Sequence, residues 1–357
     1  MKVGIITFHS AHNYGAMLQA YGLQEYLKGK GCDTYIIDYR PDYITKCYLR
    51  DNSRDWLSKN PIMCCKRIFN YIRYRNIRHR RWDGFYSFIK NRFSLYPYHK
   101  GDDFHDFDAI FIGSDQVWSS SHTSGQFDDL MFGVGFKCKA ISYAPSCSKY
   151  SLNENESDYF RRHLDDLYAI SVREQSFKDM LLPLTKKDIE VVLDPTLLAG
   201  ENVFANIAQT IDYKKPYVVV YEIISHKEVL EMAKETANQI GADVVELTNG
   251  IGKHRNTMKE DASPEEFLGY IKNATCVVTT SFHGTAFSIL FQKPFYMVRQ
   301  RRPADGRMVS LLTALGLERR LVDMNDKVTF CDIDYTLVSS RLAKLRKDSI
   351  SFINKNL

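Results

Sequence analysis

Short apolar segments alternate with amphipathic, helix-like segments along most of this 357-residue chain. The apolar segments are rich in β-branched residues and end at polar, glycine or proline positions, as β-strands do. They occupy residues 2–7, 34–39, 108–112, 139–144, 169–172, 217–224, 243–247, 276–280 and 294–298. Because helical segments separate them, the pattern predicts an α/β fold with parallel sheets covered by helices on both faces.

The chain is longer than one hydrophobic core usually supports, which favours two domains. The strand and helix pattern restarts at Tyr217, after Pro195 and Pro216 interrupt it. We therefore predict an N-terminal domain over residues 1–205 and a C-terminal α/β domain over residues 206–330. Residues 331–357 form a basic amphipathic helix that we expect to pack back on the N-terminal domain.

A basic segment at about residues 44–100 breaks the alternation. Between Lys66 and Arg92 it holds nine lysines and arginines against one acid, Asp83, with apolar residues at helical spacing. One interpretation is an inserted helical segment with a solvated basic face. The other is a surface for an anionic membrane or a polyanionic chain.

Composition and motif content narrow the classes of function. The net charge of +5 is too small to imply nucleic acid as a partner. The N-terminus lacks a signal-peptide pattern, and no run of about 18 apolar residues would span a bilayer. The eight cysteines show no C-x-x-C pair, which is typical of reduced thiols in a cytoplasmic protein. We expect no bound metal, and Gly133-Val-Gly135 lacks the third glycine of a dinucleotide fingerprint.

The residues after the strand at 276–280 form the most informative polar corner. Ser281, His283, Gly284 and Thr285 precede a helix predicted over residues 286–291. A helix N-terminus favours an anion, and a histidine beside it can hold or move a proton. The alternative is a helix cap with a satisfied loop histidine.

Further polar groups follow other predicted strands, on the side where α/β sheets bind ligands. Asn13 and Gly15 begin the first helix, where Asn13 serves either as a cap or as a ligand contact. Ser114, Asp115 and Gln116 form a hydrogen-bonding corner in which Asp115 could accept a proton from a sugar hydroxyl.

Arginines supply the candidate anion-binding groups. Arg173 ends a strand and either binds a phosphate or carboxylate or pairs with Glu174. Three more candidates lie in the loop after residue 298, which is interpreted as an anion clamp or as a solvated loop. These candidates are Arg299, Arg301 and Arg307. Asp194-Pro-Thr196 is most simply interpreted as the end of a strand.

Taken in their order along the chain, these polar clusters resemble the polysaccharide pyruvyl transferase family. The matching segments are Asn13-Tyr-Gly-Ala-Met-Leu-Gln19, Ile112-Gly-Ser-Asp-Gln-Val-Trp118, Tyr143-Ala-Pro145, Ser171-Val-Arg-Glu174, Leu193-Asp-Pro-Thr196 and Thr280-Ser-Phe-His-Gly284. The resemblance implies a fold like that of GT-B glycosyltransferases, with two Rossmann-like domains facing a cleft. It also implies phosphoenolpyruvate as donor, no further cofactor, and a sugar of a cell-surface glycan or lipid-linked precursor as acceptor, which receives pyruvate as a ketal.

Carried over residue by residue, the resemblance implies His283 as the essential histidine and Arg173 as the basic residue of the first domain. We expect His283 to act as a general acid and Asp115 to be a weaker candidate for the base. One departure is Ser281, because family members often carry an arginine two positions before the histidine. Either the downstream arginines substitute for it or the donor differs.

Two other functions stay open at this point. One is a nucleotide-sugar glycosyltransferase on the same fold, although no base or ribose pocket is evident in the sequence. The other is a non-catalytic glycan-binding relative. We expect the protein to act in the cytoplasm, with a peripheral contact at the inner membrane face if the basic segment binds anionic lipid.

Overall fold

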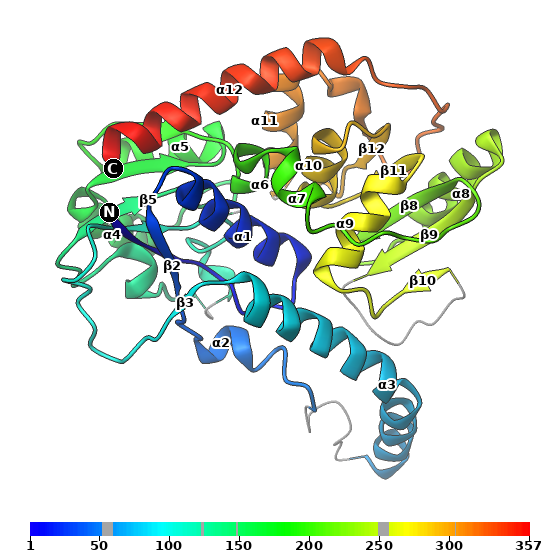
Figure 1. The fold of residues 1–357 in the computed structure, drawn as a ribbon, viewed down its shortest axis with the longest axis horizontal. Coiled ribbons are helices and arrows are strands. Elements are labelled where there is room, and N and C mark those ends of the chain that lie inside the picture. The colour runs from blue at the N-terminus through cyan, green and yellow to red at the C-terminus, as the bar shows by residue number, and fades with distance from the viewer. Residues whose placement is uncertain (52–59, 123–124, 148, 249–256, 304) are drawn as a thin grey trace.

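Two parallel β-sheets, flanked by helices, form the body of the protein (Figure 1). The computed structural model describes residues 1–51, 60–122, 125–147, 149–248, 257–303 and 305–357. In this part of the chain the first sheet has seven strands in the order β3-β2-β1-β4-β5-β6-β7. They are β1 Lys2–Ile6, β2 Asp33–Ile37, β3 Leu95–Tyr96, β4 Ala109–Ile112, β5 Lys139–Ser142, β6 Ala169–Val172 and β7 Ile189–Val191.

The second sheet has six described strands, in the order β10-β9-β8-β11-β12-β13. They are β8 Tyr217–Glu222, β9 Asp243–Thr248, β10 Met258–Lys259, β11 Cys276–Thr279, β12 Phe295–Val298 and β13 Leu321–Val322. Residues of β4, β8, β11 and β12 are buried throughout, as expected of parallel strands covered on both faces. The predicted α/β class with two Rossmann-like units is confirmed.

Helices connect the strands of both sheets. Those between residues 14 and 205 are α1 Tyr14–Gly29, α2 Asp42–Thr45, α3 Pro61–Arg92, α4 Glu154–His163, α5 Gln175–Leu181, α6 Pro195–Ala199 and α7 Glu201–Ala205. The later ones are α8 Lys227–Ile240, α9 Pro264–Asn273, α10 Phe282–Leu290, α11 Asp305–Leu315 and α12 Tyr335–Asn356. Short 3-10 turns cover Ser120–His122, Asp129–Phe132, Leu164–Asp166, Leu182–Leu184 and Glu318–Arg320.

The basic segment folds mainly as one long helix, α3, of 32 residues. Its second half packs on the body, where Phe85 and Phe88 are fully buried. Its first half extends away from both sheets (Figure 1). The segment ends in β3, a short edge strand of the first sheet that the sequence pattern did not predict.

The last helix, α12, crosses from the second sheet to the first (Figure 1). Near its start, the Tyr335 hydroxyl donates to the carbonyl of Lys293, 2.7 Å away. Further along, Ser349 Oγ accepts from the backbone N–H of Leu193 at 2.9 Å. The helix therefore contacts both domains.

In each sheet the strand order reverses beside a central strand, at β1 and β4 in the first sheet and at β8 and β11 in the second. Ligands of open α/β sheets bind beyond the carboxyl ends of strands at such reversals. This identifies the segments after β4 and β11 as the place to look for a site.

Candidate active site

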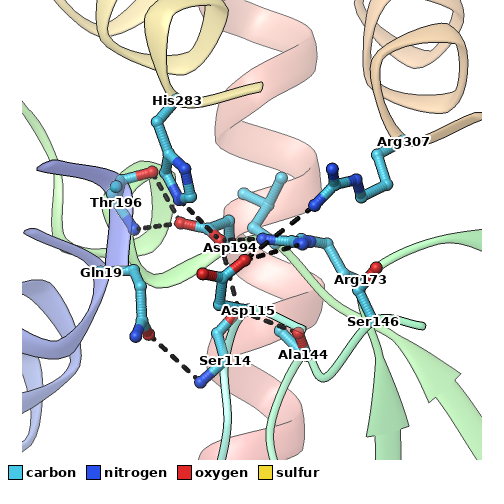
Figure 2. A network of polar contacts seen from close by, with 12 residues as sticks. Gln19, Ser114, Asp115, Ala144, Ser146, Arg173, Asp194, Thr196, His283 and Arg307 are labelled. Atoms are coloured by element: carbon cyan, nitrogen blue, oxygen red, sulfur yellow. Dashed lines mark hydrogen bonds and ion pairs between the residues drawn. The ribbon is translucent and has the colours of Figure 1, made fainter. Parts of the chain in front are cut away.

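A buried carboxylate, Asp194, is the hub of a polar network between the domains (Figure 2). It is the N-cap of α6, and its Oδ1 accepts from the backbone N–H and the hydroxyl of Thr196, at 3.0 and 2.8 Å. Its Oδ2 accepts from Arg173 Nη1 at 2.8 Å and lies 3.2 Å from Ser114 Oγ. Three strand ends of the first sheet thus meet at one carboxylate.

His283 reaches the same carboxylate from the second domain. It lies in the first turn of α10, and its Nε2 is 3.6 Å from Asp194 Oδ2. This distance is that of an ion pair and is too long for a direct hydrogen bond. Only 6% of His283 is exposed. A Cβ placed on Gly15, at the start of α1, would lie 2.0 Å from His283 Nδ1, so the glycine lets the imidazole approach the helix.

Two guanidinium groups lie on the other side of Asp194. Arg173 Nη2 is 3.5 Å from Asp115 Oδ1, and Arg307 Nη1 is 4.0 Å from the same oxygen (Figure 2). The Cζ atoms of Arg173 and Arg307 lie 4.6 and 5.9 Å from the ring centre of Phe282. An arginine beside an aromatic ring keeps its in-plane N–H groups available for an anion.

The charges of this network shift the pKa values of its members. Burial alone would raise the pKa of Asp194, but the imidazole of His283 and the guanidinium of Arg173 hold it well below its usual range. Burial, together with the charge of Arg173, lowers the pKa of Arg307 to about 10. The burial of two cations near each other makes a site that would gain from an added anion.

Glu174 is a second buried acid in the network. Its Oε1 accepts from Ser146 Oγ at 2.6 Å, and its Oε2 is 3.8 Å from Arg173 Nε. Burial raises the pKa of Glu174 even though Arg173 and Arg307 oppose that shift. The pair between Arg173 and Glu174, which the sequence left open as an alternative, is thus present but long. The shorter bond of Arg173 goes to Asp194.

Asp115 and Ala144, just after the ends of β4 and β5, are two of the five described non-glycine residues with positive φ. Both residues adopt the left-handed region, with φ of 66° and 52°. Such conformations cost non-glycine residues free energy and recur at functional sites. The carbonyl of Asp115 accepts from Ser146 N–H at 2.8 Å, and the side chain of Asp115 is 18% exposed, more than those of Asp194 and Arg173.

Several sequence candidates have mainly local structural contacts. Asn13 is the N-cap of α1 and accepts from Gly15 N–H at 2.9 Å. Gln116 lies in the turn after Asp115, where its carbonyl accepts from a backbone N–H. Thr285 Oγ1 donates to the carbonyl of Ser281. Gly284 allows α10 to pack on β11, because a Cβ there would lie 2.3 Å from a threonine hydroxyl.

Helix α10 begins earlier than predicted. The structure has it from Phe282, with Ser281 as the N-cap, whereas the sequence suggested a start at 286. Thr285 Oγ1 and N–H both bond to the Ser281 carbonyl, which closes the first turn. His283, Gly284 and Thr285 therefore lie inside the first helical turn and not in a preceding loop.

The expected clamp of several arginines needs correction. Arg299 Nε lies 3.3 Å and Arg301 Nη2 3.5 Å from the carboxylate of Asp323. Among the described contacts, neither arginine touches Asp115 or Asp194. Arg307 alone of the three joins the network, because α11 begins at Asp305 and carries it inward.

Sequence reasoning missed the hub. Asp194 was interpreted as the end of a strand, although its Leu-Asp-Pro-Thr context was one of the six matching segments. Phe282 and Ser146 were also not singled out. Their positions in the sequence could have identified them, because each of these residues follows a predicted strand or lies within a matching segment.

A cavity of about 80 Å³ opens beside the arginines, next to α11 and α12. A volume of this size is enough for a few water molecules. Its lining is largely apolar; the lining residues include Arg173, Val191, Leu193, Asp194, Leu197, Phe282, Arg307, Leu311, Leu345 and Asp348. Among the described residues, no group of three His, Cys, Asp or Glu side chains could hold a metal ion. No described helix is long and apolar enough to cross a membrane.

Comparison with known proteins adds two findings. A family model described as polysaccharide pyruvyl transferase matches residues 13–301. Curated protein sequences give no match. The match covers every segment that contributes to the network except α11, which carries Arg307.

Solved structures similar to this chain include Arabidopsis thaliana UGT89C1, with 12% identity, a TM-score of 0.45, and coverage of 99% of this chain and 97% of that one. UDP-GlcNAc 2-epimerase from Methanocaldococcus jannaschii has 13% identity, a TM-score of 0.44, and coverage of 97% and 92%. The glycosyltransferase SsfS6 of Streptomyces sp. SF2575 has 11% identity, a TM-score of 0.38, and coverage of 99% and 96%.

Proposed function

Because the chain belongs to the polysaccharide pyruvyl transferase family, we propose that it transfers pyruvate from phosphoenolpyruvate to a sugar and forms a pyruvate ketal. The acceptor is a sugar of a cell-surface polysaccharide or of its lipid-linked precursor. The reaction takes place in the cytoplasm, at the inner face of the membrane when the acceptor is lipid-linked. It needs no cofactor besides the donor.

The observation that carries this proposal is the meeting of one imidazole and two guanidinium groups at the domain junction. Phosphoenolpyruvate carries a phosphate and a carboxylate, so its site needs two cationic partners and a proton donor. Arg173 and Arg307 supply the two charges, and His283 supplies the proton. The first turn of α10 adds backbone N–H groups and a favourable dipole.

Arg173 has unused hydrogen-bonding capacity for such an anion. Its Nε and Nη2 are buried and make no hydrogen bond to the described residues, although they lie 3.8 Å from Glu174 Oε2 and 3.5 Å from Asp115 Oδ1. A buried guanidinium pays a free-energy penalty for unmade hydrogen bonds, and a bound phosphate or carboxylate removes it. Arg307 then compensates for Ser281, which stands where family members often carry an arginine.

The chemistry divides into two steps. His283 protonates the methylene carbon of the enol while one acceptor hydroxyl attacks the central carbon and loses its proton to a base. Asp115 is our candidate for that base because its side chain is partly exposed. The second hydroxyl then attacks the same carbon, inorganic phosphate leaves with the proton of that hydroxyl, and the ketal closes. Asp194 does not react; its charge stabilises the protonated imidazole.

The test measures phosphate release from phosphoenolpyruvate in the presence of sugar acceptors. Replacing His283 with glutamine should lower the rate by ~10²–10⁴-fold, the usual contribution of a general acid. Phosphoenolpyruvate should still raise the melting temperature of this variant, because Arg173 and Arg307 remain.

Two outcomes would contradict the proposal. Wild-type activity in the His283→Gln variant would remove the imidazole from the mechanism. Stabilisation of the wild-type protein by nucleotide sugars, with no stabilisation by phosphoenolpyruvate, would favour a nucleotide-sugar glycosyltransferase instead.

A further inference from the structure

The first half of α3 exposes an apolar stripe on its outer side. Ile62, Phe69 and Ile72 are 81%, 63% and 66% exposed, and Cys65 between them is exposed as well. These four residues, which we call the outer stripe, follow each other at spacings of three, four and three. That spacing aligns them on one face of a helix.

The opposite face of α3 holds the helix on the protein. Arg81 is buried, and its Nη1 donates to the Tyr14 hydroxyl and to the carbonyls of Thr248 and Glu260, at 3.0, 2.9 and 3.0 Å. Phe85 is fully buried on the same side of the helix. Residues that bind the body and residues of the outer stripe therefore lie about half a helical turn apart, and the outer stripe faces away from the protein.

Basic residues surround the outer stripe. Lys66, Arg73 and Arg75 are exposed, and the sequence from Pro61 to Trp82 contains no aspartate or glutamate. A second copy of the same helix would bring like charges together, which argues against a dimer through this face. An anionic lipid surface satisfies both features, because it accepts apolar side chains at the headgroup boundary and attracts lysine and arginine.

We propose that the outer stripe of α3 docks the protein on an anionic lipid bilayer. Ile72 lies nine residues before Arg81, which is about 13 Å along the helix axis. Arg81 bonds Tyr14, the neighbour of the Gly15 that contacts His283. Docking therefore brings the domain junction close to the membrane, within reach of a lipid-linked sugar; this consequence, unlike docking itself, rests on the proposed function.

The test is co-sedimentation of the full-length protein with vesicles, without donor or acceptor. Binding to phosphatidylcholine vesicles that contain phosphatidylserine should exceed binding to phosphatidylcholine alone and should fall with added salt. The double variant Lys66→Glu/Arg73→Glu should weaken binding roughly 30-fold or more. Each basic residue near an anionic surface raises the affinity for that surface about fivefold. The double variant Phe69→Ser/Ile72→Ser should weaken it roughly tenfold.

Matched controls lie on α12. Lys344→Glu/Lys347→Glu makes the same charge change at two exposed lysines, and Leu337→Ser removes an apolar side chain that is 57% exposed. Both controls should bind vesicles like the wild-type protein. Circular dichroism spectra and melting temperatures of the α3 variants should match the wild type, because the substituted side chains are exposed.

Three results would overturn the inference. These are equal binding to neutral vesicles, equal losses in the α12 controls, and unchanged binding in both α3 variants. A protein that sediments as a dimer, becomes monomeric with Phe69→Ser/Ile72→Ser and ignores vesicles would show that the outer stripe is an interface between copies. Because no substrate is present, failure here would leave the proposed reaction untouched, and failure of the reaction would leave docking untouched.

Discussion

Gly15 and His283 illustrate how one missing side chain shapes the site. A Cβ at Gly15 would come within 2.0 Å of His283 Nδ1, and the nearby ring atoms would be 2.5 and 2.6 Å away. We expect Gly15→Ala to force the imidazole away from Asp194 or the two domains apart. Overpacking of this kind typically costs about 1–3 kcal/mol of unfolding free energy. The activation free energy of phosphate release from phosphoenolpyruvate should rise by at least as much as the unfolding free energy falls.

The same helix provides the control for this prediction. Gly29 is the last residue of α1, and a Cβ there would meet no atom within 4 Å. Gly29→Ala should be neutral or should stabilise the protein by up to about 1 kcal/mol, as alanine does in helices. Chemical denaturation and steady-state kinetics of both variants check the prediction. Equal behaviour of the two variants would mean that the close approach at Gly15 is unimportant.

Arg307 should govern donor binding. Replacing it with glutamine removes a charged hydrogen-bond donor that we assign to phosphoenolpyruvate, and such bonds are worth about 1.5–3 kcal/mol. The KM for phosphoenolpyruvate should therefore rise roughly 10- to 100-fold, with a smaller change in the KM for the acceptor. Arg299→Gln and Arg301→Gln serve as controls, because these arginines pair with Asp323. A larger effect in either control than in Arg307→Gln would reverse the assignment.

At the residue scale, the sequence identified candidate catalytic and anion-binding side chains but not the side chains that they contact. His283, Arg173 and Asp115 follow predicted strands, and strand ends at the same edge of a sheet come together. The sequence indicated the end of a strand at Asp194, whereas the residue caps α6, and the local pattern gave no sign of its contacts with His283 and Arg173. The contact with Arg173 joins two strand ends of the first sheet, and the contact with His283 forms only when the two domains meet.

At the scale of elements, His12 links α3 to the first domain and makes stability depend on pH. Its ring stacks on Tyr48 and Phe85, with centroids 5.5 and 5.1 Å apart. Burial, followed by the charges of Arg81 and Arg40, lowers the pKa of His12 from 6.5 to about 4. The folded protein therefore binds this proton less well than the unfolded chain does, and stability falls as pH decreases from 6.5 to 4.

The size of this effect follows from the shift. A pKa lowered by two to three units corresponds to about 3 kcal/mol of unfolding free energy, fully present above pH 6.5 and lost near pH 4. His12→Phe keeps an aromatic ring in the stack but removes the titration. Its stability should fall less than that of the wild type over this pH range, as measured by denaturant unfolding. Parallel pH profiles would show that His12 does not titrate in this way.

The long strands and helices were predictable, and the short ones were not. Segments such as β4, β8 and β11 have continuous β-branched runs, and α8 has strong helical periodicity, so local pattern identified them. The strands β3 and β13 have two residues each and exist only because a neighbouring strand offers hydrogen bonds. The early start of α10 depends on the closed first turn at Ser281, which helix periodicity from residue 286 did not reveal.

At the scale of the whole molecule, the two sheets share one continuous apolar core. A single cluster of buried residues includes Val3 and Phe111 of the first sheet and Val219 and Val277 of the second. The sequence predicted two α/β units, but the packing between them depends on residues far apart in the chain. The shared core explains why His283 reaches Asp194 across the junction.

The helix α12 should strengthen this junction through Arg346. Both its Nε and its Nη2 donate to the carbonyl of Leu197, at 3.0 and 2.8 Å. This carbonyl lies in α6, the five-residue helix that begins after Asp194, so Arg346 holds the far end of the segment that carries the hub. Arg346→Met keeps much of the aliphatic length but loses both bonds and leaves a carbonyl without them, which should cost about 1–3 kcal/mol of unfolding free energy.

The neighbouring residue supplies the comparison. Lys347 is exposed on the same helix, and Lys347→Met should change stability by no more than about 0.5 kcal/mol. Denaturant unfolding followed by tryptophan fluorescence measures both variants. If Arg346 couples the domains, Arg346→Met should also broaden the transition, because the first domain then unfolds less cooperatively with the second. Equal midpoints and slopes in the two variants would mean that the shared core alone holds the domains together.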